Sequence, residues 1–423
     1  MKKLTNPLHV DPSHLVAAHL TPPISKSDAQ RALVLAHLTG TWPLPVLQSE
    51  PEHSMAADVK VLTRGIETLR QPPGPVRDVD CADGGAPFRI FVTQAALTPG
   101  ARVRITGTPR LGERPHGPLF ESLREALGPS GLVIKEGQPW PVEIHAPTST
   151  GEPVFRVPGE QSSQYASSLL LGCAALFLRE HRPWRVEIVG PLTSAGYLEL
   201  TVNWLRRFGF TVEERDNRFE VTAYQAPERA PAMPGDWSSL GYLLLISWRT
   251  GGGAERADLT SAHPDQALVR LVERAGLSAV PGPDNTLRLT GTARDGLVAS
   301  GKECPDLLPT LAALACVLPR PSTLHDVSVL RLKESDRLEG IRTLVTAFGG
   351  TTSLDGESLT IQPPASHPAH FSMDSKGDHR LAMVSATLAV LSGVPLTLTG
   401  PECVEKSFPG FWQQLERAGV RLS

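Results

Sequence analysis

Three short polar segments of this chain combine lysine with hydroxyl or acidic residues. They are Ser25–Asp28, Arg331–Arg337 and Val404–Pro409. Lysine is scarce in the chain, at 9 residues against 32 arginines, so its presence in all three segments is informative. A lysine ammonium is compact and titratable, and the rigid guanidinium of arginine cannot replace it. The three segments therefore indicate an enzyme that handles phosphate or carboxylate groups.

Two further segments place ionisable residues directly before apolar helices. Gly377–Arg380 precedes the apolar run 381–391, and Asp306 precedes the apolar run 307–317. A charged group at the start of a buried helix is costly unless it is paired or functional. These segments therefore predict a second group of site residues.

Some of these patterns also have an ordinary structural interpretation. Lys333 and Arg337 are spaced i, i+4, which predicts that they share one helix face while Glu334 projects elsewhere. The alternative is a solvated helix start whose acidic residues suit the helix dipole. Ser162–Gln164, Ser27 and Ser194 likewise fit either a helix N-cap or an anion ligand.

The elements that must position these residues recur along the chain. A polar loop that leads into a small-residue apolar helix occurs six times, and each copy is followed by an amphipathic helix with apolar residues at helical spacing. The period is about 70 residues. Two of the polar loops are expected at 159–164 and 235–240, each leading into such a helix. The other apolar helices are expected near 31–36, 88–90, 307–317 and 381–391, and the amphipathic helices near 58–69, 119–127, 197–208, 267–275, 338–348 and 411–418.

Short segments of alternating polarity lie between the helices. Arg102–Thr106, Arg185–Val189 and Thr286–Thr290 alternate with period two, which predicts β-strands. Each repeat would then hold strands and two helices, an α/β arrangement. The Pro-rich stretch Pro227–Pro234 is typical of a linker and would leave three repeats on each side.

Composition excludes several classes of function. The net charge of −3 leaves no basic stripe for general nucleic-acid binding. The five cysteines contain no C-x-x-C pair, and His367 and His370 have no second ligand pair near them, so neither a disulfide framework nor a metal site is expected. Because no signal peptide or 18-residue apolar run is present, we expect a cytoplasmic protein that is not bound to membranes. No exposed apolar stripe is apparent, and we expect a monomer.

The order of these segments resembles that of the 5-enolpyruvylshikimate-3-phosphate synthases, a family of enolpyruvyl transferases. The resemblance runs from about Leu20 to Phe411, and the Lys-Glu-Ser-Asp-Arg and Asp-His-Arg segments are its most specific parts. The segments that carry it are Lys26-Ser27 with Arg31, Pro109-Arg110 through Pro115, Ser162-Ser163-Gln164, Lys333 to Arg337, Asp378-His379-Arg380 and Lys406 to Pro409.

The resemblance implies a fold of two domains, each of three βαβαββ units, that close on the substrates. The crossovers would fall near 21–24 and 233–237, giving domains of 24–234 and of 1–23 plus 235–423. It implies a transferase that moves the enolpyruvyl group of phosphoenolpyruvate to the 5-hydroxyl of shikimate 3-phosphate by addition and elimination. No metal or organic cofactor is implied. Two alternatives are an enolpyruvyl transferase with another hydroxyl acceptor and a non-catalytic binding homologue.

The resemblance also implies roles for individual residues. Asp306 would be the base for the attacking hydroxyl, and Glu334 would handle the proton at the methylene carbon, with Lys26 and His379 nearby. Shikimate 3-phosphate would contact Lys26, Ser27, Arg31, Ser162, Ser163, Gln164, Ser194, Tyr197, Asp306 and Lys333. Phosphoenolpyruvate would contact Lys26, Gly85, Arg89, Arg114, Gln164, Arg337, Arg380 and Lys406.

The chain departs from the family pattern in three places. Ile24 and Ala29-Gln30 stand where the family usually has Gly and Ser-Asn. The loop Asp83–Ala86 stands where the family usually has Asn-Ala-Gly-Thr, which brings a negative charge close to an expected anion site and removes a hydroxyl. These changes bear on acceptor identity, on phosphoenolpyruvate affinity and on the response to glyphosate.

Overall fold

The chain folds into two compact units, each described here by itself. The computed structural model describes residues 5–41, 55–72, 74–128, 132–134, 141–146, 152–160, 162–192, 195–229, 231, 233–331 and 333–423. Unit 1 comprises Met1–Ser25, Glu52–Ala56 and Pro234–Ser423, and unit 2 comprises Lys26–Pro51 and Ala57–Met233. Among the described helices, none combines the length and apolar character needed to cross a membrane.

Each unit has three inner helices. They are α1 (Lys26–Leu38), α4 (Gly85–Leu97) and α7 (Ser163–Glu180) in unit 2, and α9 (Trp237–Thr250), α11 (Leu308–Ala315) and α13 (His379–Ser392) in unit 1. These helices are rich in small and apolar residues on most sides, so they are stable only in an interior. In unit 2, a Cβ atom at Gly172 on α7 would lie 2.6 Å from Leu97 of α4, so glycine allows these two helices to pack closely.

Six outer helices cover the inner ones with an apolar face. They are α3 (Ala57–Arg70), α6 (Gly117–Leu127), α8 (Ala195–Arg207), α10 (Leu268–Arg274), α12 (Arg337–Ala347) and α14 (Phe411–Arg417). Short helical turns complete the set: α5 (Pro109–Gly112), η2 (Pro264–Ala267), η3 (Val327–Leu330) and η4 (Pro401–Lys406). Inner and outer helices alternate along the chain at all twelve positions that the periodicity predicted, so these helix predictions are confirmed.

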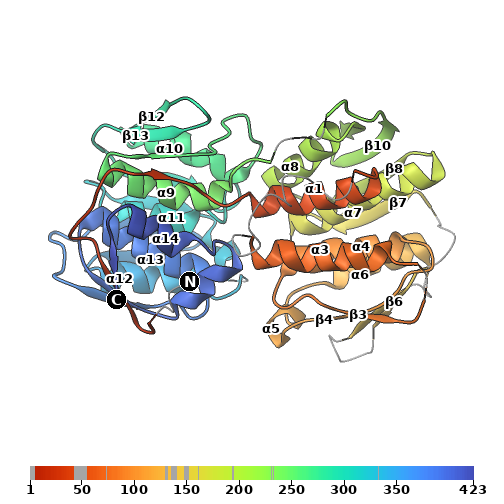
Figure 1. Ribbon diagram of the computed structural model, residues 1–423, viewed down its shortest axis with the longest axis horizontal. Helices are drawn as coiled ribbons and strands as arrows, with labels where there is room; N and C mark the ends of the chain where they lie inside the picture. Colours follow the sequence, from red (N-terminus) through yellow and green to blue (C-terminus); the bar gives the residue numbers. More distant parts are fainter. Residues whose placement is uncertain are drawn as a thin grey trace. The chain divides into compact units, whose positions relative to one another are not determined.

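The described residues hold five four-stranded sheets, all of mixed type. Their strand orders are β3-β4-β6-β5 and β7-β8-β10-β9 in unit 2, and β12-β13-β11-β2, β14-β15-β17-β16 and β18-β19-β1-β20 in unit 1. In unit 2 the helices lie between the two sheets (Figure 1). The strand bounds are β1 (Leu8–Asp11), β2 (His19–Leu20), β3 (Arg77–Asp80), β4 (Arg102–Thr106), β5 (Leu132–Ile134), β6 (Val142–His145), β7 (Val154–Pro158), β8 (Trp184–Val189), β9 (Phe210–Arg215), β10 (Arg218–Tyr224), β11 (Gly253–Ala254), β12 (Ser278–Pro281), β13 (Leu287–Thr290), β14 (Val298–Ser300), β15 (Ser322–His325), β16 (Thr351–Asp355), β17 (Ser358–Gln362), β18 (Phe371–Asp374), β19 (Leu396–Thr399) and β20 (Arg421–Leu422).

One pairing pattern recurs in three of the five sheets. Two parallel strands, such as β7 and β8, are joined through an inner helix, and an antiparallel hairpin, such as β9 and β10, follows the outer helix. In unit 1 the N-terminal strands complete two sheets, because β2 pairs with β11 and β1 lies between β19 and β20. The predicted α/β class and the three predicted strands are confirmed, whereas the six-fold βαβαββ repeat stays a prediction.

The two segments that connect the units pair with each other. Ile24 and Gly235 form an antiparallel bridge, which the backbone bonds from Ser25 N to Pro234 O (3.0 Å) and from Asp236 N to Pro23 O (2.9 Å) extend. A side chain at Gly235 would lie 2.8 Å from the backbone oxygen of Arg256, so this close approach requires glycine. Ile24 and Gly235 lie in the two segments where the family resemblance implies the crossovers, which stay a prediction.

Candidate active site

In unit 1, the polar segments that precede three helices converge on one cluster. Asp306 precedes α11, the segment 333–336 precedes α12, and Asp378 caps α13. Lys406 ends the turn η4, which packs against α13. Four cationic side chains, of Lys333, Arg337, Arg380 and Lys406, here contact the three carboxylates of Asp306, Glu334 and Asp378.

Arg337 is the centre of this cluster. Its Nη1 lies 3.1 Å from Asp306 Oδ1, its Nη2 lies 2.6 Å from Glu334 Oε2 and its Nε lies 2.8 Å from Asp378 Oδ2. The side chain is only 1% exposed. Burial disfavours the charged form, but Asp378 and Glu334 overcome it and raise the pKa of Arg337. Arg337 therefore stays cationic and aligns all three carboxylates.

Asp306 faces three cations. Its Oδ1 lies 3.1 Å from Arg337 and 3.6 Å from Lys333 Nζ, and its Oδ2 lies 3.3 Å from Arg380 Nη2. Burial alone would raise the pKa of Asp306, but Arg380, Lys333 and Arg337 hold it well below its usual range. The carboxylate is therefore ionised and able to accept a proton.

Asp378 and His379 stand at the start of α13. Asp378 Oδ1 accepts a hydrogen bond from Arg380 N at 2.9 Å, while its Oδ2 accepts bonds from Arg337 Nε and Ser335 Oγ. Burial opposes the ionised form, yet Arg337 and His379 lower the pKa of Asp378. His379 is buried beside this carboxylate. Asp378 thus both caps the helix and anchors Arg337.

The helical arrangement predicted for the Lys333–Arg337 segment is wrong. Helix α12 begins only at Arg337, because Asp336 is its N-cap and accepts a bond from Glu339 N at 3.1 Å. Glu334 lies outside the helix and turns back onto Arg337, rather than projecting elsewhere. Its other oxygen lies 3.5 Å from Lys406 Nζ. Lys333 and Arg337 nevertheless meet at the same group, Asp306.

In unit 2, the start of α1 presents Lys26, Ser27 and Arg31. Lys26 Nζ lies 3.1 Å from Asp58 Oδ2 of α3. Arg31 is buried and donates to Thr201 Oγ1 at 2.8 Å, to Ser27 O at 2.7 Å and to Tyr197 O at 2.9 Å. Burial lowers the pKa of Arg31 to about 10, so it remains charged at neutral pH. Arg31 therefore ties α1 to the first turn of α8.

A second basic group of unit 2 lies at the starts of α4 and α7. Arg89 donates through Nη1 to Gln164 Oε1 and through Nη2 to Pro115 O at 3.0 Å. Burial, reinforced by the like charge of Arg114, lowers the pKa of Arg89 to about 10. Arg114 lies against Gly85, where a Cβ atom would come within 2.1 Å of Nη1. Two neighbouring guanidinium groups are a suitable place for an anion.

The remaining predicted residues of unit 2 lie near the start of α7 and of α8. Ser162 caps α7 by accepting a bond from Gln164 N at 3.2 Å, which supports the cap interpretation. Ser163 is the buried first residue of that helix, and Tyr197 lies in the first turn of α8. Ser194 lies outside the described residues. Asp83 is half-buried and precedes Gly84, the N-cap residue of α4.

Sequence reasoning missed several partners of the site. Asp58 binds Lys26, and Thr201 binds Arg31. In unit 1, Ser238 contacts Arg380, and Asp265 contacts Ser238. Two of these partners had weak local signals. Asp58 is an acidic residue in the first turn of α3, and Ser238 follows Asp236 in a predicted loop. Nothing in the sequence singled out Thr201 or Asp265.

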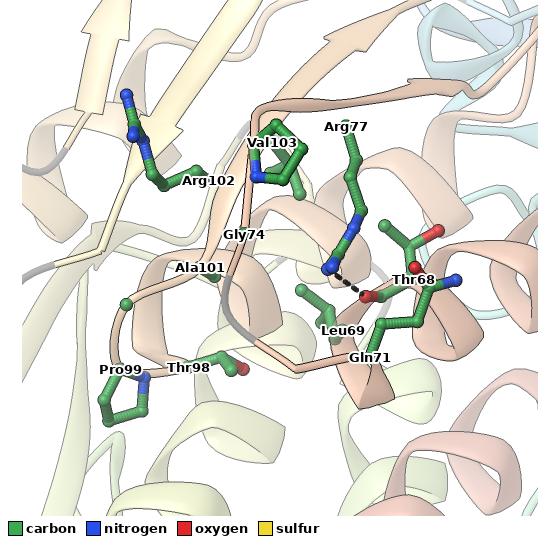
Figure 2. A pocket seen from close by; sticks show the side chains of 12 residues that line it. Thr68, Leu69, Gln71, Gly74, Arg77, Thr98, Pro99, Ala101, Arg102 and Val103 are labelled. Atoms are coloured by element: carbon green, nitrogen blue, oxygen red, sulfur yellow. Dashed lines mark hydrogen bonds between the residues drawn. The ribbon is translucent and has the colours of Figure 1, made fainter.

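A pocket of unit 2 lies near the C-terminal ends of α3 and α4 (Figure 2). Its volume is about 400 Å³, including space open to solvent. Arg77 in this pocket donates to the backbone oxygens of Thr68 (3.2 Å) and Pro72 (2.6 Å), as Figure 2 shows for Thr68. Arg77 thus caps the end of α3, and this pocket contains none of the predicted site residues.

The α/β fold, with clustered Arg, Lys and carboxylate side chains at the starts of its inner helices, defines an enzyme class that acts on small anionic substrates. The sequence model of the EPSP synthase (3-phosphoshikimate 1-carboxyvinyltransferase) family matches residues 10–415. The chain therefore belongs to this transferase family.

Individual relatives agree with this assignment. A 3-phosphoshikimate 1-carboxyvinyltransferase from Methanoculleus marisnigri is 33% identical over 392 residues, which cover 86% of this chain and 89% of the relative. One from Methanopyrus kandleri is 32% identical, and the match covers 96% of each chain. An EPSP synthase structure from Acinetobacter baumannii has a TM-score of 0.76 at 18% identity, covering 99% of this chain and all of that one. The enolpyruvyl transferase NikO from Streptomyces tendae has a TM-score of 0.60 at 13% identity, with 100% and 99% covered. The two structures show the same fold.

Proposed function

We propose that this chain transfers the enolpyruvyl (1-carboxyvinyl) group of phosphoenolpyruvate to the 5-hydroxyl of shikimate 3-phosphate and releases inorganic phosphate. The observation that carries the proposal is the cluster of unit 1, where Asp306 is ionised and contacts Arg337, Lys333 and Arg380. A base beside several cations suits a reaction that deprotonates an alcohol next to multiply charged anions. Membership of the transferase family supports the same reaction.

The proposed reaction has an addition step and an elimination step. In the addition step, Asp306 accepts the proton of the 5-hydroxyl, the hydroxyl oxygen bonds to C2 of phosphoenolpyruvate, and C3 takes a proton that Glu334 carries once the substrates are bound. In the elimination step, C3 returns that proton to Glu334, the bond from C2 to the phosphate oxygen breaks, and the departing phosphate takes the proton held by Asp306. Atoms balance without an added oxidant or cofactor. Lys26 and His379 assist in these proton transfers.

The contacts of Asp306 indicate how the base becomes effective. With its pKa held well below the usual range, Asp306 is a weak base while its three cations point at it. The phosphate and carboxylate groups of the substrates offer these cations alternative partners. Binding would therefore draw positive charge from Asp306, raise its pKa and strengthen it as a base.

The remaining roles follow the two basic groups of unit 2 and the charged cluster of unit 1. We assign to shikimate 3-phosphate the residues Lys26, Ser27, Arg31, Ser162, Ser163, Gln164, Ser194, Tyr197, Asp306 and Lys333. We assign to phosphoenolpyruvate the residues Lys26, Gly85, Arg89, Arg114, Gln164, Arg337, Arg380 and Lys406. Because Arg31 already donates three bonds within the protein, its main contribution is to hold Ser27 and Tyr197 in place.

Further properties belong to the same proposal. The protein is a cytoplasmic monomer that needs no metal or organic cofactor and binds no nucleic acid, as its composition and its resemblance suggest. Its domains run over 24–234 and over 1–23 plus 235–423, with six repeats in all. Size-exclusion chromatography with light scattering would test the monomer, and a metal chelator should leave activity unchanged.

The decisive experiment is phosphate release from phosphoenolpyruvate. Release is expected with shikimate 3-phosphate present and is not expected without an acceptor or with shikimate alone. Release with shikimate alone would show that the 3-phosphate is not recognised. If phosphoenolpyruvate binds but no phosphate appears with shikimate 3-phosphate, the acceptor is another hydroxyl compound and Asp83–Ala86 is the loop to examine.

A further inference from the structure

A buried polar pair, Ser238 and Asp265, lies next to Arg380. Ser238 is the second residue of α9, and Asp265 lies in η2. Arg380 Nη2 donates to Ser238 Oγ at 3.3 Å, and Ser238 Oγ donates to Asp265 Oδ2 at 2.5 Å. Asp265 is 0% exposed and Ser238 is 6% exposed. A chain of hydrogen bonds thus runs from the guanidinium to a carboxyl group in the interior.

The direction of these bonds is determined by chemistry. A guanidinium group can only donate, so the Ser238 oxygen must accept from Arg380 and the hydroxyl hydrogen is left for Asp265. Burial raises the pKa of Asp265, while His263 and Arg380 act in the opposite direction. In either protonation state a carboxyl oxygen can accept the hydroxyl hydrogen. The single orientation of the hydroxyl makes the contact with Arg380 specific.

Both members of the pair are themselves fixed in place. Asp236 caps α9 by accepting a bond from Ser239 N at 2.7 Å, which holds the first turn around Ser238. The ring nitrogen Nδ1 of His263 accepts a bond from Asp265 N at 3.1 Å, which fixes the start of η2. The pair is therefore a rigid support rather than a flexible surface contact.

We propose that Ser238 and Asp265 are positioning residues that hold the guanidinium of Arg380 in place for phosphoenolpyruvate. This inference rests on the proposed function of Arg380. Arg380 also contacts Asp306, through Nη2 to Oδ2 at 3.3 Å and through Nη1 to the backbone oxygen at 2.9 Å. The contact with Oδ2 weakens when Asp306 accepts a proton and loses its charge. An anchor that takes no part in proton transfer keeps Arg380 in position at that moment.

The direct test is the crystal structure of the Ser238→Ala variant. Because Asp306 still attracts the guanidinium, we expect Arg380 Nη2 to shift from its position beside residue 238 towards Asp306 Oδ2. An unmoved guanidinium would overturn the inference. This measurement does not depend on activity. A failure of the proposed function would appear separately, as absent turnover by the unaltered protein.

The kinetic test is a double-mutant cycle with Arg380→Gln. Ser238→Ala should raise KM for phosphoenolpyruvate about ten-fold, because one hydrogen bond to a charged group is lost. KM for shikimate 3-phosphate should change little. In the Arg380→Gln background, Ser238→Ala should raise it no further. Equal effects in both backgrounds would show that Ser238 does not act through Arg380.

Two further variants separate positioning from a general loss of stability. Ser238→Thr retains the hydroxyl and should restore most of the affinity, whereas a KM as high as that of Ser238→Ala would contradict the hydroxyl's role. Ser247→Ala is the matched control, because Ser247 is buried in the same helix and its hydroxyl bonds only to Leu244 O at 2.9 Å. Its kinetic constants should equal those of the unaltered protein.

Discussion

The Gly85→Ala substitution adds one carbon atom next to the Arg114 guanidinium and so tests the proposed phosphoenolpyruvate site of unit 2. A Cβ atom at position 85 would lie 2.1 Å from Arg114 Nη1, 2.5 Å from Cζ and 2.9 Å from Nη2. Ordinary contact between such atoms begins at about 3.4 Å. The guanidinium must therefore move by about 1.3 Å, because the helix backbone is fixed and the side-chain end is flexible.

This displacement has a calculable effect on binding. A charge-assisted hydrogen bond of about 2.8 Å that lengthens by more than 1 Å is no longer a hydrogen bond. Its loss costs about 1.5–3 kcal/mol, which corresponds to roughly a 10- to 150-fold rise in KM for phosphoenolpyruvate. Because Arg114 has no role in proton transfer, kcat should change much less. Alanine at the first residue of α4 should not destabilise the helix.

The assay is steady-state phosphate release at varied phosphoenolpyruvate and saturating shikimate 3-phosphate, with the melting temperature as a check on folding. Gly117→Ala is the matched control, since Gly117 is also the first residue of a helix in unit 2 and its Cβ would meet only Glu121 at 3.9 Å. An unchanged KM for phosphoenolpyruvate in Gly85→Ala would refute the assignment of Arg114.

Three other predictions concern the carboxylates and one histidine. Asp306→Asn and Glu334→Gln should each lower kcat by about 10²–10⁴ while circular dichroism stays unchanged, and near-normal turnover of either variant would contradict its role in proton transfer. Burial lowers the pKa of His116 to about 3, below the unfolded value of 6.5, so the unfolded chain binds more protons and stability should fall as pH drops from about 6.5 towards 3. Urea midpoints of His116→Gln should vary less with pH over that window, and an identical slope would contradict the buried neutral ring. The folded-state pKa of Asp378 is lowered, so its contribution to stability is present above about pH 4 and is lost as the pH falls through the folded value. Asp378→Asn should therefore be less stable at pH 7 and lose less stability on acidification, as measured by the same urea titrations.

Much of the fold could be predicted because its signals are local. The buried helix α13 shows its burial in a continuous run of small and apolar residues, and the amphipathic helix α6 shows it in a spacing of three or four residues. The strand Arg102–Thr106 was predicted to the residue, since alternation over five residues reflects one buried face. The same locality explains the error at Glu334. The i, i+4 spacing assumes that Lys333 to Arg337 is helical, whereas the N-cap is Asp336 and the helix begins only at Arg337.

The pairing of charges could not be predicted, because it depends on which helix starts pack together. Asp306 and Arg380 are 74 residues apart in the chain, and Lys26 and Asp58 belong to different helices. Ser238 has only a weak local signal and Asp265 has none, and burial beside Arg380 makes both of them relevant.

The sequence by itself determined which residue types handle anions, where the twelve main helices lie and where three of the strands lie, since all of these depend on neighbours within a few positions. The tertiary structure alone decided that Arg337 holds three carboxylates and that β1 completes the sheet of β18, β19 and β20. The physical reason is that charge pairing and sheet completion depend on contacts between distant segments, which long-range packing creates.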